Sequence, residues 1–355
     1  MKTEASEFTP PAHVRWRKIG ESVTSHYMNT QRKDVFIDPC ECIKKLFDAA
    51  KAAVANVPKN DQTGDHRARA MRTLRGVNRF HAHVKAYEYA KNAEAIYRDT
   101  VPGKWRVATE AQIKECGLES GADLVLVQFD KNGRPTKTPF KAHIAIPENM
   151  EFCDPMPATL VFKGTAVLED WLNNAQQGMD MDSDYYKKAV ELGAMIKNAS
   201  RPVSITGHSL GGGLAAACAH TCGKDAWTFN AAGLHPNTVE RYGEVPVSAN
   251  LKAYRHEGEV LTAVQEPGWA GKFARVLLPM LALGPTLGNL VTKRLRQLPA
   301  APGTQHDLPC IQDDWDSVER HGMSNTLQSF NTMLREAEDQ LRQQTGVQCK
   351  QPVIV

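Results

Sequence analysis

The stretch VSITGHSLGGGLAAACAH, residues 203–220, constrains the fold more than any other part of the sequence. It begins with a short β-branched run typical of a buried strand, and it continues as small apolar residues at helical spacing. Between the two stands Ser209, with Gly207 and Gly211 on either side. Glycines at those positions indicate a strand-to-helix turn that leaves little room for side chains. We therefore predict a strand–turn–helix unit with a serine at its apex.

The segments around this turn alternate between strand-like and helix-like patterns, and turn residues separate them. Such alternation predicts right-handed βαβ units and an α/β fold with a mostly parallel central sheet. We expect strands at residues 122–130, 140–147, 158–164, 202–207, 225–233 and 248–258, and helices at residues 183–199, 209–223, 236–243 and 323–344. Asp184 is a plausible N-cap for the first of these helices.

An N-terminal helical extension precedes the α/β part. Residues 42–57 place apolar side chains on one helical face, and residues 68–97 follow as a second, charge-rich helix. Two helices joined by a polar loop predict a helical hairpin, whose charged faces we expect to be solvated. We divide the chain into residues 1–104, an irregular arm plus this hairpin, and residues 105–355, the α/β domain.

Charge and composition exclude some classes of protein. The formal charge is +3 and no basic cluster is interleaved with aromatic residues, so we expect no binding of nucleic acid. The first twenty residues lack the apolar core of a secretory signal, so we expect synthesis in the cytoplasm. The eight cysteines are scattered, and we expect buried free thiols, because no second pair stands near Cys218 and Cys222 to complete a zinc site.

A serine at such a turn suggests nucleophilic chemistry, but a hydroxyl alone is a weak nucleophile and needs a base oriented by an acid. In α/β-hydrolases the chain order is serine, then acid, then histidine. Glu257 and Glu259 follow a predicted strand, and His321 lies in a loop before the last helix. His306 is the competing histidine, although a surface loop residue is the simpler interpretation.

Three segments together carry a family resemblance: LVFKGTAVLEDWLNN, VSITGHSLGGGLAA and RHGMSNTL. From about residue 139 to 335 the chain resembles the class 3, fungal-type lipases, and it is most similar to the lipase-like effectors of bacterial type VI secretion. The resemblance implies an α/β-hydrolase fold with Ser209 as the nucleophile and His321 as the general base. It also implies an oxyanion hole formed by the backbone N–H groups of Thr165 and Leu210.

The chain departs from this family at two positions. Glu259 stands where the family usually has aspartate, with Glu257 as the fallback for the acid. Lys163 stands where the family often has arginine, next to the predicted oxyanion loop; an ordinary strand residue explains it as well.

The resemblance further implies a lipase or phospholipase that hydrolyses acyl esters of membrane phospholipids without a required cofactor. As a type VI effector it would be an antibacterial toxin. It would be delivered to the periplasm of a target cell, with a secretion carrier and an immunity protein as possible partners. Two alternatives remain open: an intracellular esterase or neutral-lipid lipase, and a non-enzymatic binding module on a degenerate hydrolase fold.

Two further segments suggest accessory roles. Residues 262–303, between the predicted acid and histidine, combine an apolar run with basic residues, which fits either a lid that docks on anionic lipid or a helical cap packed on the core. Acidic residues before and within the helix at 183–199 fall at calcium-loop spacing, but Tyr185 occupies the position that needs glycine. Helix capping therefore explains these residues better than a calcium site: Asp180, Asp182, Asp184 and Glu191.

Overall fold

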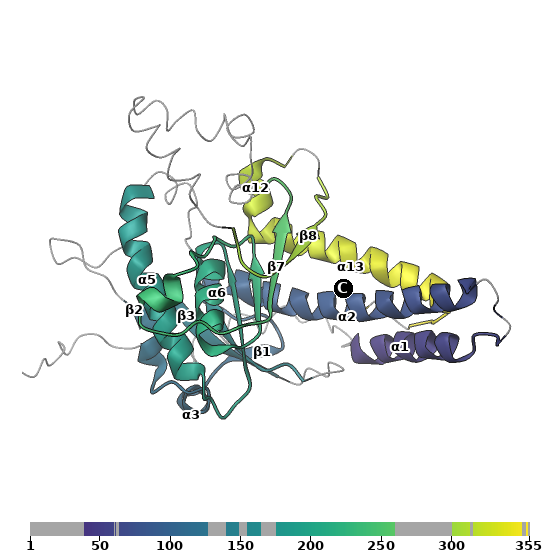
Figure 1. The fold of residues 1–355 in the computed structure, drawn as a ribbon, viewed down its shortest axis with the longest axis horizontal. Helices are drawn as coiled ribbons and strands as arrows, with labels where there is room; N and C mark the ends of the chain where they lie inside the picture. Colours follow the sequence, from purple (N-terminus) through teal and green to yellow (C-terminus); the bar gives the residue numbers. More distant parts are fainter. Residues whose placement is uncertain are drawn as a thin grey trace, which may run out of the picture. The chain divides into compact units, whose positions relative to one another are not determined.

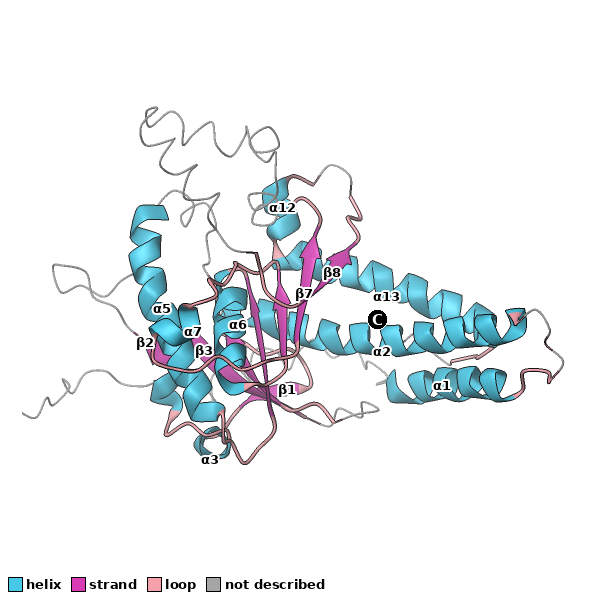
Figure 2. Cartoon of the chain, viewed as in Figure 1, coloured by secondary structure: helices cyan, strands magenta, loops and turns pink. Residues whose placement is uncertain are grey.

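The computed structural model describes residues 39–59, 61, 64–126, 140–148, 155–164, 175–259, 300–312, 315–349 and 353. A mostly parallel sheet forms its centre, and helices cover both faces (Figures 1 and 2), which confirms the predicted α/β class. The strands are β1 (Trp105–Val107), β2 (Val125–Leu126), β3 (Phe140–Pro147), β4 (Ala158–Phe162), β5 (Val203–His208), β6 (Ala226–Phe229), β7 (Leu251–His256) and β8 (Thr304–Leu308).

The strand order explains where a site can form. The sheet runs β1-β3-β4-β5-β6-β7-β8, with β2 paired to β3, and β4 through β8 are all parallel. The antiparallel strands lie at one side, where β3 pairs with both β1 and β4. Because parallel strands point the same way, the residues that follow β4, β5, β6 and β7 meet at one edge of the sheet.

Helices from distant parts of the chain cover the two faces of the sheet (Figure 1). Successive strand residues point to opposite faces, so Leu160 joins the core shared with α5 and α6, while Val161 joins the core shared with α2 and α13. The described helices are α1 (Pro39–Ala55), α2 (Asp65–Ala95), η1 (Ile96–Arg98), α3 (Glu110–Glu115), η2 (Gly121–Leu124), α5 (Ala175–Ile196), α6 (Leu210–Cys222), α7 (Thr238–Arg241), α12 (Ser317–His321) and α13 (Met323–Thr345).

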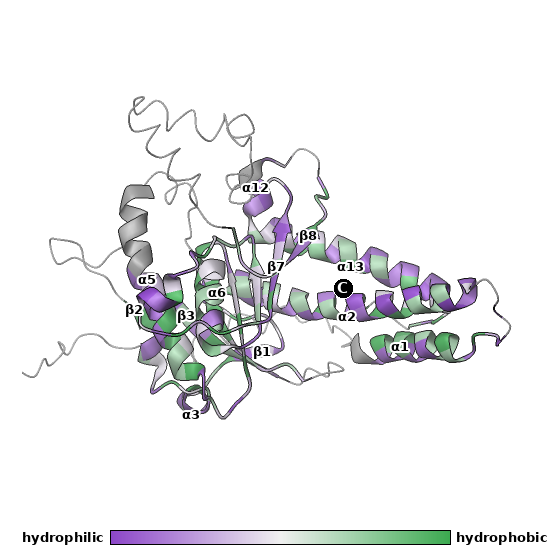
Figure 3. Ribbon diagram, viewed as in Figure 1, coloured by the Kyte–Doolittle hydropathy of each residue, from purple (hydrophilic) through white to green (hydrophobic). Residues whose placement is uncertain are grey.

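Burial accounts for the composition of these helices. The helix α6 is apolar along most of its length (Figure 3), and nearly every residue in it is buried because it lies between the sheet and α5. By contrast, α13 alternates between apolar and charged residues, as expected of a helix with one face in solvent. Within the described part of the chain, no helix is both long enough and apolar enough to cross a membrane.

The helix α2 packs directly on the sheet as well as on α1. The ring of Tyr89 stacks on that of Trp227 of β6 with centroids 4.0 Å apart, and the ammonium of Lys252 lies 4.4 Å from the Trp227 ring. Aromatic stacking and cation–π attraction therefore anchor the middle of α2 to the sheet. The predicted pair of N-terminal helices is present, while the domain boundary at residue 104 stays a prediction.

A disulfide joins Cys42 of α1 to Cys349, which follows α13. The prediction that the cysteines are free thiols is therefore wrong for this pair. Spacing could not reveal it, because the two residues are 307 positions apart and meet only when α1 and α13 lie side by side. Among the described residues, Cys116, Cys218, Cys222 and Cys310 are free.

Candidate active site

Ser209 lies between the end of β5 and the start of α6, with a φ of 57° and a ψ of −127°. A left-handed backbone is strained for a residue other than glycine, so the surrounding contacts must hold it. Its N–H donates to the carbonyl of Phe229 at 3.1 Å, and its own carbonyl accepts from the N–H of Ala232 at 2.9 Å. The neighbouring strand β6 and the residues after it thus fix the turn.

The glycines around Ser209 are required by close backbone approach. A Cβ added at Gly207 would collide with the backbone of Gly211, and one added at Gly211 would collide with the carbonyl of Phe162 and the N–H of Gly164. The turn after β5 and the loop after β4 are therefore in backbone contact. Only glycine allows this approach, which agrees with the tight turn predicted from the sequence.

His321 and Glu259 meet although 62 residues separate them. Nδ1 of His321 lies 2.6 Å from Oε2 of Glu259, and both residues are buried. An ionised carboxylate only accepts hydrogen bonds, so Nδ1 carries the proton that it donates to Glu259. In the neutral ring, Nε2 then has a free lone pair. Nε2 is buried and has no hydrogen-bond partner among the described residues, so it is available as a base.

The two competing candidates lie elsewhere. The side chain of Glu257 is exposed, and its backbone carbonyl accepts a hydrogen bond from Arg320 at 3.1 Å. His306 lies on β8, where the sequence predicted a loop, and its ring stacks on Tyr254 at 4.7 Å. Of the predicted acids and bases, Glu259 and His321 are the two that the described structure brings into contact.

Two side chains hold the backbone of His321 in place. The sequence patterns did not predict either of them as part of the site. Nε2 of His208 and Nδ2 of Asn230 donate to the carbonyl of His321 at 2.8 and 3.0 Å. Asn230 follows β6 and also accepts from the N–H of His256 at 3.0 Å through Oδ1. The available signal was positional: polar residues placed at the carboxyl ends of adjacent parallel strands.

Burial keeps His208 neutral. Removal from water, together with the smaller effect of the nearby His321, lowers its pKa to about 3. Because a carbonyl oxygen can only accept, Nε2 of His208 carries the ring proton, and Nδ1 is an acceptor. The hydroxyl of Tyr97 lies 2.9 Å from that Nδ1 and donates to it.

The remaining predicted residues are only partly described. Leu210 is buried and begins α6, so its N–H belongs to the first turn of that helix. Thr165 and most of the predicted lid at 262–303 lie outside the described residues. Lys163 forms an ion pair with Asp99 at 3.5 Å, and Lys141 pairs with the same carboxylate at 2.6 Å.

The calcium-loop pattern does not form a loop. The helix α5 begins at Ala175 and runs through all four acidic positions, so Asp184 is inside the helix and the prediction that it is an N-cap is wrong. Glu191 pairs with Lys188 on the same helix. In the described part of the chain, no group of three or more histidine, cysteine or acidic residues is placed to hold a metal ion.

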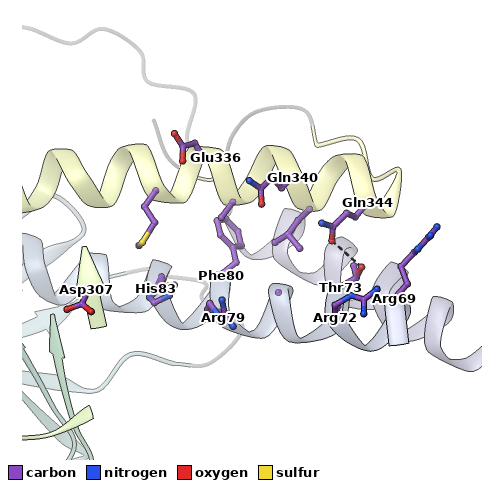
Figure 4. Close-up of a pocket in the computed structure, with 14 residues that line it drawn as sticks. Arg69, Arg72, Thr73, Arg79, Phe80, His83, Asp307, Glu336, Gln340 and Gln344 are labelled. Atoms are coloured by element: carbon purple, nitrogen blue, oxygen red, sulfur yellow. Dashed lines mark hydrogen bonds between the residues drawn. The ribbon is translucent and has the colours of Figure 1, made fainter. Parts of the chain in front are cut away.

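A cavity of about 720 Å³ lies between α2 and α13 (Figure 4). Phe80 and Leu341 contribute apolar surface to it, three arginines line it from α2, and Thr73 donates to the side-chain oxygen of Gln344 at 3.1 Å. The cavity contains none of the predicted site residues, so it is separate from the candidate active site. The arginines are Arg69, Arg72 and Arg79.

Residues 88–314 match the phospholipase-like family, in the form described as a Tle-like phospholipase domain. The chain belongs to this family. The match spans more than half of the chain and confirms the resemblance to the lipase effectors that the sequence motifs indicated. It includes Ser209 and Glu259, whereas His321 lies just beyond its end.

A second comparison concerns a single protein. The phospholipase-like chain is 39% identical over 115 residues to an extracellular phospholipase A1 of Serratia liquefaciens. The similar stretch covers 30% of this chain and 36% of the Serratia protein. The chain thus matches about a third of the length of that relative.

Proposed function

We propose that the protein is a phospholipase A that hydrolyses acyl esters of membrane phospholipids through an acyl-enzyme on Ser209. The observation that carries this proposal is the buried hydrogen bond between His321 and Glu259. His208, which directly precedes Ser209, donates a hydrogen bond to the backbone carbonyl of His321 and so links this pair to the serine turn. Membership of the phospholipase-like family and similarity to a phospholipase A1 support the choice of phospholipid as substrate.

In the proposed reaction, Oγ of Ser209 attacks the acyl carbonyl carbon while its proton passes to Nε2 of His321. The ester C–O bond then breaks, and the lysophospholipid leaves with that proton. Water attacks the acyl-enzyme in the second half, with His321 again as the base, and releases the fatty acid. Glu259 keeps the ring in the required tautomer and stabilises the imidazolium that forms.

Charge on the carbonyl oxygen needs hydrogen-bond donors in each half of the reaction. The backbone N–H groups of Leu210 and Thr165 are the proposed donors, and the first belongs to the N-terminal turn of α6, where the helix dipole favours negative charge. Every group that this proposed reaction uses belongs to the protein, so the proposal includes no required cofactor. Whether calcium affects the activity is a separate question that the lipid assay tests.

The test uses vesicles of phosphatidylethanolamine and phosphatidylglycerol, with products identified by mass spectrometry, for the wild type and Ser209→Ala. We expect fatty acid plus lysophospholipid from the wild type and a loss of at least about 10⁴-fold in the variant. Parallel samples with calcium and with a chelator show whether the ion matters. Turnover of a short p-nitrophenyl ester without lipid cleavage would favour the esterase, and no turnover of either would favour a non-enzymatic module.

We further propose that the protein is an antibacterial type VI effector that acts in the periplasm of the target cell. The disulfide supports action in an oxidising compartment, because such bonds are rare in the cytoplasm. The same observation argues against the intracellular esterase. A secretion carrier and an immunity protein are then the expected partners.

Expression in a Gram-negative host tests this second proposal. The chain is produced once in the cytoplasm and once with a signal for export to the periplasm, each time beside Ser209→Ala. We expect growth arrest and lysophospholipid accumulation only for the exported wild type. Equal toxicity from both compartments, or toxicity of the exported serine variant, would contradict the proposal.

A further inference from the structure

Tyr97 connects the N-terminal helices to the candidate active site. It belongs to η1, directly after α2, and its hydroxyl oxygen lies 2.9 Å from Nδ1 of His208, a residue 111 positions later. The two rings meet edge to face, with centroids 5.7 Å apart. Tyr97 lies outside both the serine turn and the predicted acid and base, so the proposed chemistry does not yet use it.

The direction of each hydrogen bond follows from the chemistry of its partners. The carbonyl of His321 can only accept, so Nε2 of His208 donates to it, and Nδ1 of the neutral ring must accept from Tyr97. Burial raises the pKa of Tyr97, so the phenol keeps the proton that it donates. One hydroxyl proton therefore selects the ring state that holds the backbone of His321.

The same hydroxyl also contacts the loop after β4. A Cβ added at Gly164 would collide with both the hydroxyl oxygen of Tyr97 and the carbonyl of His208, so the Gly164 backbone packs closely against that oxygen. Gly164 directly precedes Thr165, one of the proposed oxyanion donors. Tyr97 thus lies where three chain segments meet: the loop after β4, the serine turn and the segment that carries His321.

We propose that Tyr97 is a positioning residue for the proposed hydrolysis. Its hydroxyl fixes the ring of His208, which in turn holds the backbone of His321, and its oxygen packs against the loop at Gly164. This inference rests on the proposed function, because it assigns a role to Tyr97 in that reaction. It makes the N-terminal helices part of the active-site framework.

The test is Tyr97→Phe, with Tyr254→Phe as the matched control. The hydroxyl of Tyr254 also lies 3.0 Å from Nδ1 of a partly buried histidine, His83, but it contacts none of the proposed catalytic residues in the described chain. Each variant therefore loses one tyrosine–histidine hydrogen bond and keeps its ring. With a short p-nitrophenyl ester, we expect kcat to fall by about 10- to 100-fold in Tyr97→Phe with KM changed by less than about twofold. Tyr254→Phe should stay within about twofold of the wild type.

A readout that does not depend on turnover accompanies the kinetics. In protein labelled with ¹⁵N-histidine, Nδ1 of His208 should give the resonance of a hydrogen-bonded acceptor, which moves to that of a bare nitrogen in Tyr97→Phe. The control should move the resonance of His83 instead. Thermal unfolding of both variants shows whether the folded fraction is the same.

Three results would overturn the inference. These are an unchanged His208 resonance, a kcat within about twofold of the wild type in Tyr97→Phe, and an equal loss of activity in both variants. If the wild type hydrolyses no ester, the proposed function fails and the positioning role fails with it. If only the inference fails, the wild type is active and loses its activity in Ser209→Ala, while Tyr97→Phe gives one of the three results above.

Discussion

Glu259 is fully buried and bonded to His321, in the position where the lipase resemblance leads us to expect aspartate. An ionised carboxylate without partners would be costly there, so its environment must supply hydrogen bonds. The longer side chain still reaches Nδ1 at 2.6 Å. Glutamate is thus sterically compatible with the role of orienting acid.

We expect Glu259→Gln to lower kcat by about 10²- to 10⁴-fold, because an amide no longer favours the tautomer with a free Nε2. The fall should be measured with a soluble ester, together with far-ultraviolet circular dichroism to verify folding. Glu257→Gln is the control, since that side chain is exposed, and it should retain nearly full activity. A larger loss in Glu257→Gln than in Glu259→Gln would reverse the assignment of the acid.

Sequence patterns could single out Ser209, Glu259 and His321 as candidates, because each stands in a short motif or follows a predicted strand. They could not single out Tyr97 or Asn230 for the site. The contact between Tyr97 and His208 spans 111 positions, and that between Asn230 and the carbonyl of His321 spans 91. Such contacts depend on how α2 and α13 pack on the sheet, which local periodicity does not specify.

Among the secondary-structure elements, those with a strong periodic pattern were predicted well. The strand β3 has the predicted bounds, and α13 differs by one residue at its end. The strand β8 was missed because its sequence, TQHDL, is polar, and most of its side chains are partly or fully exposed at the end of the sheet. Its pairing with β7 therefore comes from the backbone rather than from an apolar pattern.

The packing of α13 on the sheet has a central contact in Phe330, which is fully buried against Phe229 and Tyr254. We expect Phe330→Ala to lower the free energy of unfolding by about 3–5 kcal/mol, because it removes a buried aromatic ring and leaves a cavity. Urea unfolding followed by circular dichroism measures the change. The exposed Gln340 on the same helix is the control, and Gln340→Ala should stay within about 0.5 kcal/mol. Similar values for both variants would mean that α13 contributes little through this contact.

For the molecule as a whole, the disulfide restricts the unfolded chain more than the folded one. We expect its removal, by Cys42→Ser with Cys349→Ser, to lower the free energy of unfolding by about 2–5 kcal/mol. Unfolding with and without dithiothreitol measures this: the reductant should destabilise the wild type and leave the double variant unchanged. Cys310→Ser should behave as the wild type, because Cys310 is a free thiol. Insensitivity of the wild type to reductant would show that the bond does not form in solution.

Acid should also destabilise the folded molecule. Burial lowers the pKa of His83 and His143 to about 4 and that of His208 to about 3, below the ordinary value of 6.5. At a pH between the folded pKa values and 6.5, the unfolded chain binds more protons than the folded one. The contribution of these neutral histidines to stability is therefore complete above about pH 6.5 and is lost as the pH falls toward 4.

The melting temperature measured between pH 7.5 and 4.5 tests this effect. It should decrease with falling pH, and His143→Leu should decrease less steeply, since His143 is buried and its Nε2 has no partner in the described structure. His143 is not part of the proposed catalytic machinery, so the variant isolates the protonation effect. An equally steep decrease in the variant would assign the acid sensitivity to other groups.

The bond between Cys42 and Cys349 also closes nearly the whole chain into a covalent ring. Cutting a ring at one point opens it without dividing it. A protease that cleaves one peptide bond between these cysteines would therefore leave Ser209 and His321 in a single covalent molecule. The clipped protein would run as one band on a non-reducing gel and as two on a reducing gel, and its halves could not diffuse apart before they fold together again.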